Sequence, residues 1–91
     1  MHLNYREDPV AGAGYLSLAE PVQSPSGRVK TTFEYNIHTY IDFDADGKAL
    51  GIEFLSLPPS IDDTALLEHA GLSSGEVLAV QTFLAENSGK S

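Results

Sequence analysis

The chain has 91 residues, with 13 acidic side chains, 5 lysines and arginines, no cysteine and a formal charge of −8 at pH 7. A chain of this length has room for one modest core, so we expect a single domain over residues 1–91. An acidic surface repels phosphate backbones and anionic lipid head groups, which argues against nucleic-acid and membrane partners. It suits a basic protein partner or a cation.

The composition also indicates a compartment. Without cysteine no disulfide can form, and residues 1–8 are polar and lack the apolar core of a signal peptide. The apolar runs are only a few residues long, far below the roughly 20 residues that cross a bilayer. Because domains without disulfides are typical of a reducing compartment, the sequence predicts a cytoplasmic protein.

The first two thirds of the chain alternate apolar and polar residues, as β-strands do. After a short apolar start, residues 15–19 and 29–35 each read as a strand. The alternation from Ile37 to Phe43 predicts a strand with both of these residues on its apolar face, and residues 50–54 form the last strand. We therefore expect an antiparallel meander of four to five strands with one apolar side.

The last third of the chain is predicted to form two helices. The first begins with Ser60 as its N-cap and ends at Gly71, because glycine commonly follows the last turn of a helix. The second begins with Ser73 and Glu76, whose spacing is that of a capping box, and extends to about residue 86.

The predicted fold class is α+β, with an antiparallel sheet in residues 3–57 and a two-helix C-terminal extension in residues 60–86. Short helices need tertiary packing to persist, so the helical hairpin either packs on the apolar face of the sheet or forms a dimer contact. Small domains without disulfides often oligomerise, which predicts a homodimer. Pairing of edge strands and docking of the helices would both serve as a dimer contact. The preferred candidates are apolar residues of the second helix, namely Val77, Val80, Phe83 and Leu84.

One segment matches the pattern of a calcium-binding loop. Asp42, Asp44, Asp46, Gly47 and Glu53 have its spacing and its residue types. True loops of this kind lie between two helices, whereas strand patterns flank this one. Asp46 and Gly47 are also residues that tight turns prefer, which favours a β-hairpin with these two at its tip. Weak cation binding by Asp42, Asp44 and Asp46 at the turn remains an alternative.

The hairpin also accounts for the apolar residues on both sides of the turn. A four-residue turn over 45–48 places Phe43 opposite Leu50 and Ile41 opposite Ile52. All the large apolar side chains then lie on one face, which is the condition that selects the register of a half-buried strand.

Two further patterns give no evidence of DNA binding or of catalysis. Residues 64–77 resemble a helix–turn–helix, but the second helix has no lysine or arginine to contact DNA. The histidines, His2, His38 and His69, lie in separate segments, and the chain has neither a catalytic cysteine nor a nucleophile elbow. The sequence therefore predicts no catalytic residue and no cofactor site.

A family resemblance rests on three segments: Tyr5 with Asp8, residues 15–18, and the block IDFDADGKALGIEFL at 41–55. Together they resemble a small bacterial domain of unknown function, the family numbered 2283, over residues 3–57. Residues 6–7 and 13–14 depart from its pattern. The resemblance implies a compact sheet domain, and some members of the family are encoded beside small basic proteins with a toxin-like character.

Size, acidity and the lack of catalytic groups together lead to one functional hypothesis. The chain is predicted to be a non-enzymatic interaction module that neutralises a basic protein partner, in the manner of an antitoxin. The alternative from a different class is a weak divalent-cation-binding protein that uses the aspartate turn.

Overall fold

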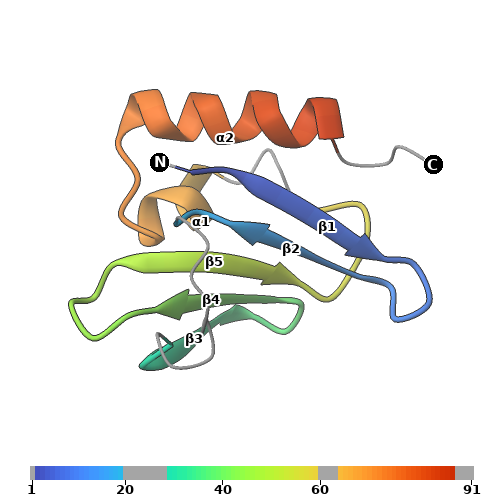
Figure 1. Ribbon diagram of the computed structural model, residues 1–91, viewed down its shortest axis with the longest axis horizontal. Helices are drawn as coiled ribbons and strands as arrows, with labels where there is room; N and C mark the ends of the chain where they lie inside the picture. Colours follow the sequence, from blue (N-terminus) through green and yellow to red (C-terminus); the bar gives the residue numbers. More distant parts are fainter. Residues whose placement is uncertain (1, 20–28, 60–63, 88–91) are drawn as a thin grey trace.

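The computed structural model describes residues 2–19, 29–59 and 64–87. These residues form a five-stranded antiparallel sheet followed by two helices, which confirms the α+β class (Figure 1). In chain order the elements are β1 (Asn4–Asp8), β2 (Ala13–Ser17), β3 (Thr31–Asn36), β4 (Thr39–Phe43), β5 (Ala49–Phe54), α1 (Thr64–His69) and α2 (Ser74–Asn87).

The strands lie in the order β1-β2-β5-β4-β3. Strands β3, β4 and β5 follow one another as in the predicted meander, whereas β2 pairs with β5 and not with β3. The last strand of the sequence is therefore the central strand, and β1 and β3 are the edges. This central place explains why every residue of β5 except Glu53 is buried.

The segment that matches a calcium loop is a hairpin between β4 and β5. Ile41 pairs with Ile52, as the sequence predicts. The expected pairing of Phe43 with Leu50 is wrong, because Phe43 pairs with Ala49 and the register shifts next to it. The shift is a β-bulge, in which β5 has one residue more than β4, and Leu50 remains buried.

The turn of this hairpin is one residue shorter than predicted. The Asp44 amide donates to the Lys48 carbonyl (2.9 Å), and the Gly47 amide donates to the Asp44 carbonyl (3.0 Å). Gly47 has a φ of 79°, a conformation that glycine adopts without steric cost. This is a three-residue loop in which a tight turn is followed by a residue in the left-handed conformation. Asp46 and Gly47 lie at its tip, as predicted.

The start of β4 also differs from the expectation. Ile37 does not face the core, since it lies in the turn between β3 and β4 and is 74% exposed. The His38 amide donates to the Asn36 side-chain oxygen (2.8 Å), which fixes this turn. The apolar face of β4 begins instead with Thr39.

The helix boundaries follow local rules. After α1, Gly71 has a φ of 85°, and the Leu72 amide donates to the Leu67 carbonyl (3.2 Å).

The capping box before α2 is formed in both directions. The Ser73 amide donates to Glu76 Oε1 (2.9 Å), and the Glu76 amide donates to Ser73 Oγ (3.3 Å). These hydrogen bonds with Ser73 lower the pKa of the Glu76 carboxyl. The predicted N-cap of the first helix, residue 60, lies outside the described residues.

One core joins the helices to the sheet, and it comprises Leu16, Leu18, Ile41, Ala49, Ile52, Phe54, Leu66, Leu67, Ala70, Val77, Val80 and Leu84. The helices therefore pack on the apolar face of the sheet. Three of the four candidate dimer contacts, Val77, Val80 and Leu84, are buried in this core, and Phe83 is half-buried against it. We correct the assignment of these residues to a dimer surface, because the sheet of the same chain already covers them.

Within the described part of the chain, no helix is both long enough and apolar enough to span a membrane.

Candidate functional site: the open face of the sheet

The face of the sheet opposite the helices consists of two rows of side chains. Each row crosses all five strands through directly paired residues. The first row is Arg6, Tyr15, Glu53, Tyr40 and Glu34, in the order β1 to β3. The second row is Asn4, Ser17, Gly51, Asp42 and Thr32. We call these ten residues the open face; apart from Gly51, all are exposed or half-buried.

A hydrogen-bonded cluster lies at the centre of the open face. The Tyr15 hydroxyl donates to Asp42 Oδ2 (3.0 Å), and the Thr32 hydroxyl donates to Asp42 Oδ1 (2.7 Å). Both oxygens of this carboxylate are therefore engaged, from strands on either side. Because Tyr15 is on β2 and Asp42 on β4, the tyrosine side chain crosses β5 to reach its acceptor.

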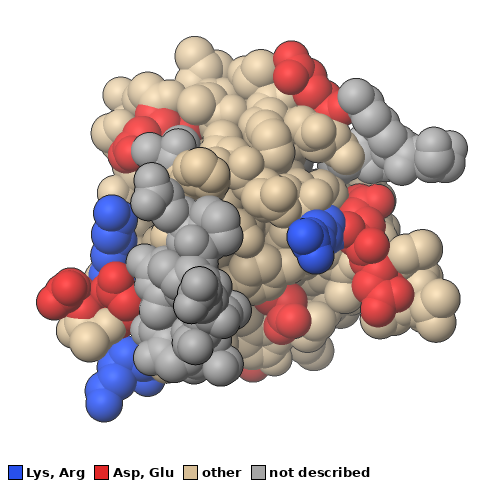
Figure 2. Space-filling model, in the orientation of Figure 1, with Lys and Arg blue, Asp and Glu red and all other residues tan. Residues whose placement is uncertain are grey.

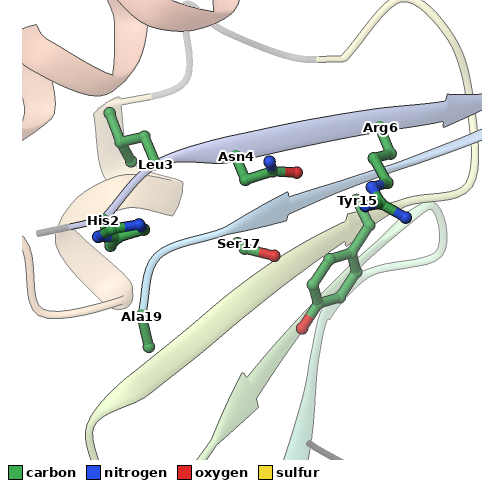
Figure 3. Close-up of a pocket in the computed structure, with 7 residues that line it drawn as sticks. All are labelled: His2, Leu3, Asn4, Arg6, Tyr15, Ser17 and Ala19. Carbon is green, nitrogen blue, oxygen red and sulfur yellow. The ribbon is translucent and has the colours of Figure 1, made fainter. Parts of the chain in front are cut away.

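The glycine in the second row makes this crossing possible. A Cβ atom placed on Gly51 would overlap the Tyr15 ring and hydroxyl. Figure 3 shows the Tyr15 side chain extending from β2 across the neighbouring strand. A glycine inside a strand often marks such a close approach of another group.

The tyrosines of the open face remain hydrogen-bond donors well above neutral pH. Burial raises the pKa of Tyr15, and the neighbouring Asp42 and Glu53 carboxylates raise it further. On the first row the Tyr40 hydroxyl donates to Glu34 Oε1 (3.1 Å), and this hydrogen bond is the main cause of a raised pKa at Tyr40.

Charge is unevenly distributed over the open face. Glu34, Asp42 and Glu53 place carboxylates on β3, β4 and β5, whereas Arg6 on the edge strand β1 is the one cationic residue of the two rows. Figure 2, drawn in the orientation of Figure 1, shows more acidic side chains than basic ones on this side of the molecule. The β5–β4–β3 half of the open face is therefore anionic.

A pocket of about 390 Å³ adjoins the other half. Its described lining carries a guanidinium and an imidazole but no carboxylate, and consists of His2, Leu3, Asn4, Arg6, Tyr15, Ser17 and Ala19. Figure 3 shows these side chains on β1, on β2 and at their ends. The pocket has space for one side chain of a bound protein, with polar groups available to contact it.

The carboxylates of the calcium-loop pattern do not form one site. Asp42 belongs to the open face, while Asp44 Oδ1 accepts hydrogen bonds from the Asp46 and Lys48 amides (both 2.9 Å) and so holds the turn. Asp46 is exposed at the tip, and Glu53 lies between Tyr15 and Tyr40 in the first row. Nowhere in the described ranges do three or more histidine, aspartate or glutamate side chains gather in a group suited to a metal ion.

The three histidines are also kept apart. His2 lines the pocket and His38 lies in the turn before β4. His69, at the end of α1, stacks on Phe33 of β3, with ring centroids 4.5 Å apart and an interplanar angle of 24°.

The alternation from Ile37 to Phe43 places Tyr40 and Asp42 on the side of the strand away from its apolar face, but it does not reveal the contribution of Tyr15. That contribution depends on the pairing of β2 with β5, which the alternation pattern does not encode. Gly51, between Leu50 and Ile52 in the middle of a strand, was the available signal, since it leaves room for a side chain from a neighbouring strand.

Comparisons with known proteins find no matching family model, no matching curated protein and no matching solved structure.

Proposed function

We propose that this chain is a non-enzymatic interaction module whose open face binds a basic protein partner and thereby neutralises it. The single observation that carries the proposal is the anionic half of the open face, where Glu34, Asp42 and Glu53 lie on adjacent strands opposite the helix-covered core.

Two physical arguments support this choice. Complementary charge between partners speeds their encounter and selects against wrong partners, and the whole chain has a formal charge of −8. Tyrosine is enriched in protein interfaces because its ring supplies contact area and its hydroxyl a hydrogen bond. Tyr15 and Tyr40 both lie on the open face, on the rows that contain the carboxylates.

The proposal includes three further elements. We propose a cytoplasmic setting, from the absence of cysteine, and a homodimer as the working form, from the small size of the domain. The resemblance to the family of unknown function over residues 3–57 remains a prediction. It would supply the kind of partner, a small basic toxin-like protein.

Cation binding at the aspartate turn is the alternative that we set aside. Asp44 already accepts two amide hydrogen bonds, and both oxygens of Asp42 accept hydroxyl groups. Asp42, Asp44 and Asp46 also do not gather into a group suited to a metal ion in the described part of the chain.

The proposal can be tested by calorimetry with a synthetic peptide rich in lysine and arginine. Glu53→Lys reverses one charge at the centre of the open face and is expected to weaken binding about fivefold, because an exposed ion pair contributes up to about 1 kcal/mol. Affinity for the parent chain should also fall as salt rises, since exposed charges are screened.

Glu68→Lys is the matched control. It makes the same change of charge on an exposed residue of α1, away from the open face, and should bind like the parent chain. Equal weakening by both substitutions would mean that the peptide senses only net charge, and that the open face is not its binding site.

A further inference from the structure

The pocket on β1 and β2 is lined by two successive cross-strand pairs. Asn4 pairs with Ser17, and Arg6 pairs with Tyr15. Because directly paired residues project from the same side of a sheet, these four side chains share one face. Figure 3 shows the Asn4 amide and the Ser17 hydroxyl extending toward the side of the pocket on which Arg6 lies. The described lining is completed by His2, Leu3 and Ala19.

The polar groups of this lining are free to bind a ligand. Within the described ranges, the side chains of Asn4, Arg6 and Ser17 form no hydrogen bond and no ion pair. The Tyr15 hydroxyl, by contrast, already donates to Asp42 (3.0 Å). A guanidinium offers N–H donors and no acceptor, and the amide and the hydroxyl add further donors. Such a set of donors around one permanent positive charge suits an anion.

The carboxylates of the sheet do not neutralise Arg6. On the same strand, Glu7 Oε2 accepts from the Tyr5 hydroxyl (2.8 Å). Asp8 Oδ1 accepts from two amides of the turn that follows (3.1 and 3.2 Å). Glu53 lies on β5, two strands away. In the described part of the chain, the charge of Arg6 is therefore left for a carboxylate from another molecule.

The chemistry of the pocket favours a carboxylate over a phosphate. The fork of an arginine matches a carboxylate with parallel hydrogen bonds. Phosphate sites commonly use a helix N-terminus or a run of backbone amides, whereas the described lining lies on β1, on β2 and at their ends. The chain charge of −8 also opposes a doubly charged anion more strongly than a singly charged one. Leu3 and Ala19 supply apolar surface for a short stem.

We propose that this pocket binds a carboxylate group on a short apolar stem, with Arg6 as the cationic ligand-binding residue and Asn4 and Ser17 as further donors. The site goes beyond the proposed function, because it takes an anion whereas the β5–β4–β3 half of the open face takes cationic groups. An acidic side chain of a protein and a small organic acid both present this group, and the experiment distinguishes them.

Nuclear magnetic resonance of the isotope-labelled full chain tests the site with three probes. Glutamate capped by an N-acetyl group and a C-terminal amide carries one carboxylate, and it should shift the amide signals of Asn4, Arg6 and Ser17 saturably. The expected dissociation constant is on the order of 1 mM for a ligand of this size. Capped glutamine has the same shape without the charge and should give no saturable shift. Tighter binding of capped glutamate than of propionate would identify a peptide as the source, and equal affinity a small acid.

Two variants show whether Arg6 holds the carboxylate. Arg6→Gln removes the fork and its charge and should weaken binding of capped glutamate about tenfold. Lys48→Gln is the matched control, because it removes one positive charge from an exposed residue outside the pocket, and it should change the dissociation constant by less than about twofold. The same spectra check that the sheet of each variant is intact.

Three results would overturn the carboxylate site. They are no saturable shift with capped glutamate, the same shifts with capped glutamine, and equal weakening by Arg6→Gln and Lys48→Gln. None of them bears on the lysine- and arginine-rich peptide, whose binding is tested at Glu53, so the site and the proposed function fail separately.

Discussion

Gly51 occupies the one buried position of the open face, directly beneath the Tyr15 ring. Replacing it with alanine requires the ring to move away and weakens its hydrogen bond to Asp42. We expect Gly51→Ala to lower the free energy of unfolding by about 1–3 kcal/mol, the range found for overpacked sites. Urea denaturation measures this change.

Gly75→Ala is the control for that substitution. Gly75 lies in α2, and a Cβ atom added to it would meet nothing within 4 Å, so alanine there should be neutral or stabilise the helix by about 0.5–1 kcal/mol. If the two variants unfold at the same urea concentration, Tyr15 does not need the space above Gly51.

The raised pKa of Tyr15 predicts how stability depends on alkaline pH. Burial and Asp42 keep the hydroxyl protonated in the folded chain, whereas an unfolded tyrosine ionises near pH 10. The unfolded state therefore releases its proton first, so the stabilisation is complete below about pH 10 and is lost as the pH rises above it. Tyr15→Phe should make the fall in unfolding free energy between about pH 9 and 11 less steep. If the unfolding free energy of that variant falls as steeply with pH as that of the parent chain, Tyr15 does not have a raised pKa in the folded state.

Among single residues, those that act on their immediate neighbours in sequence were predictable. Gly47 at a hairpin tip and Ser73 at a helix start each follow from rules that span a few residues, and the structure confirms both. The contact of Tyr15 with Asp42 joins residues 27 positions apart and depends on which strands are neighbours. No local pattern contains that information.

The capping box before α2 gives a prediction for a whole helix. Ser73→Ala removes the hydroxyl that accepts from the Glu76 amide and should cost about 1 kcal/mol of stability. Ser74→Ala, one residue later and exposed, is the comparison and should be close to neutral. Equal costs in thermal unfolding would show that the serine hydroxyl at position 73 does not cap the helix.

The face that α2 turns toward the sheet gives a second prediction for this helix. Leu84 is 1% exposed, and Leu84→Ala should lower the free energy of unfolding by about 2–5 kcal/mol because a cavity is left in the core. Leu78 is 65% exposed, and Leu78→Ala should change it by less than about 0.5 kcal/mol. A larger loss at Leu78 than at Leu84 would contradict the packing described for α2.

For the elements, the sequence predicted their type better than their partners. Alternation identified the strands, and the capping box located the start of α2 within one residue. The sequence did not reveal that β5 lies between β2 and β4, because each of these strands has an apolar face that fits several neighbours. The sequence left open whether the apolar residues of α2 pack on the sheet or form a dimer contact. In the structure these residues belong to the core of the monomer.

For the molecule as a whole, one sheet separates two environments. The helices and the apolar side chains form the core on one face, and the other face presents tyrosines and carboxylates in rows across five strands. This arrangement places the acidic side chains on which the proposed recognition of a basic partner depends on the face opposite the core.

Nuclear magnetic resonance of the isotope-labelled chain during titration with the lysine- and arginine-rich peptide tests the proposed function most directly. The amide signals of Tyr15, Tyr40, Asp42 and Glu53 should shift most, with smaller changes in α2. Shifts that are largest in α2 or that are spread evenly over the chain would contradict recognition by the open face.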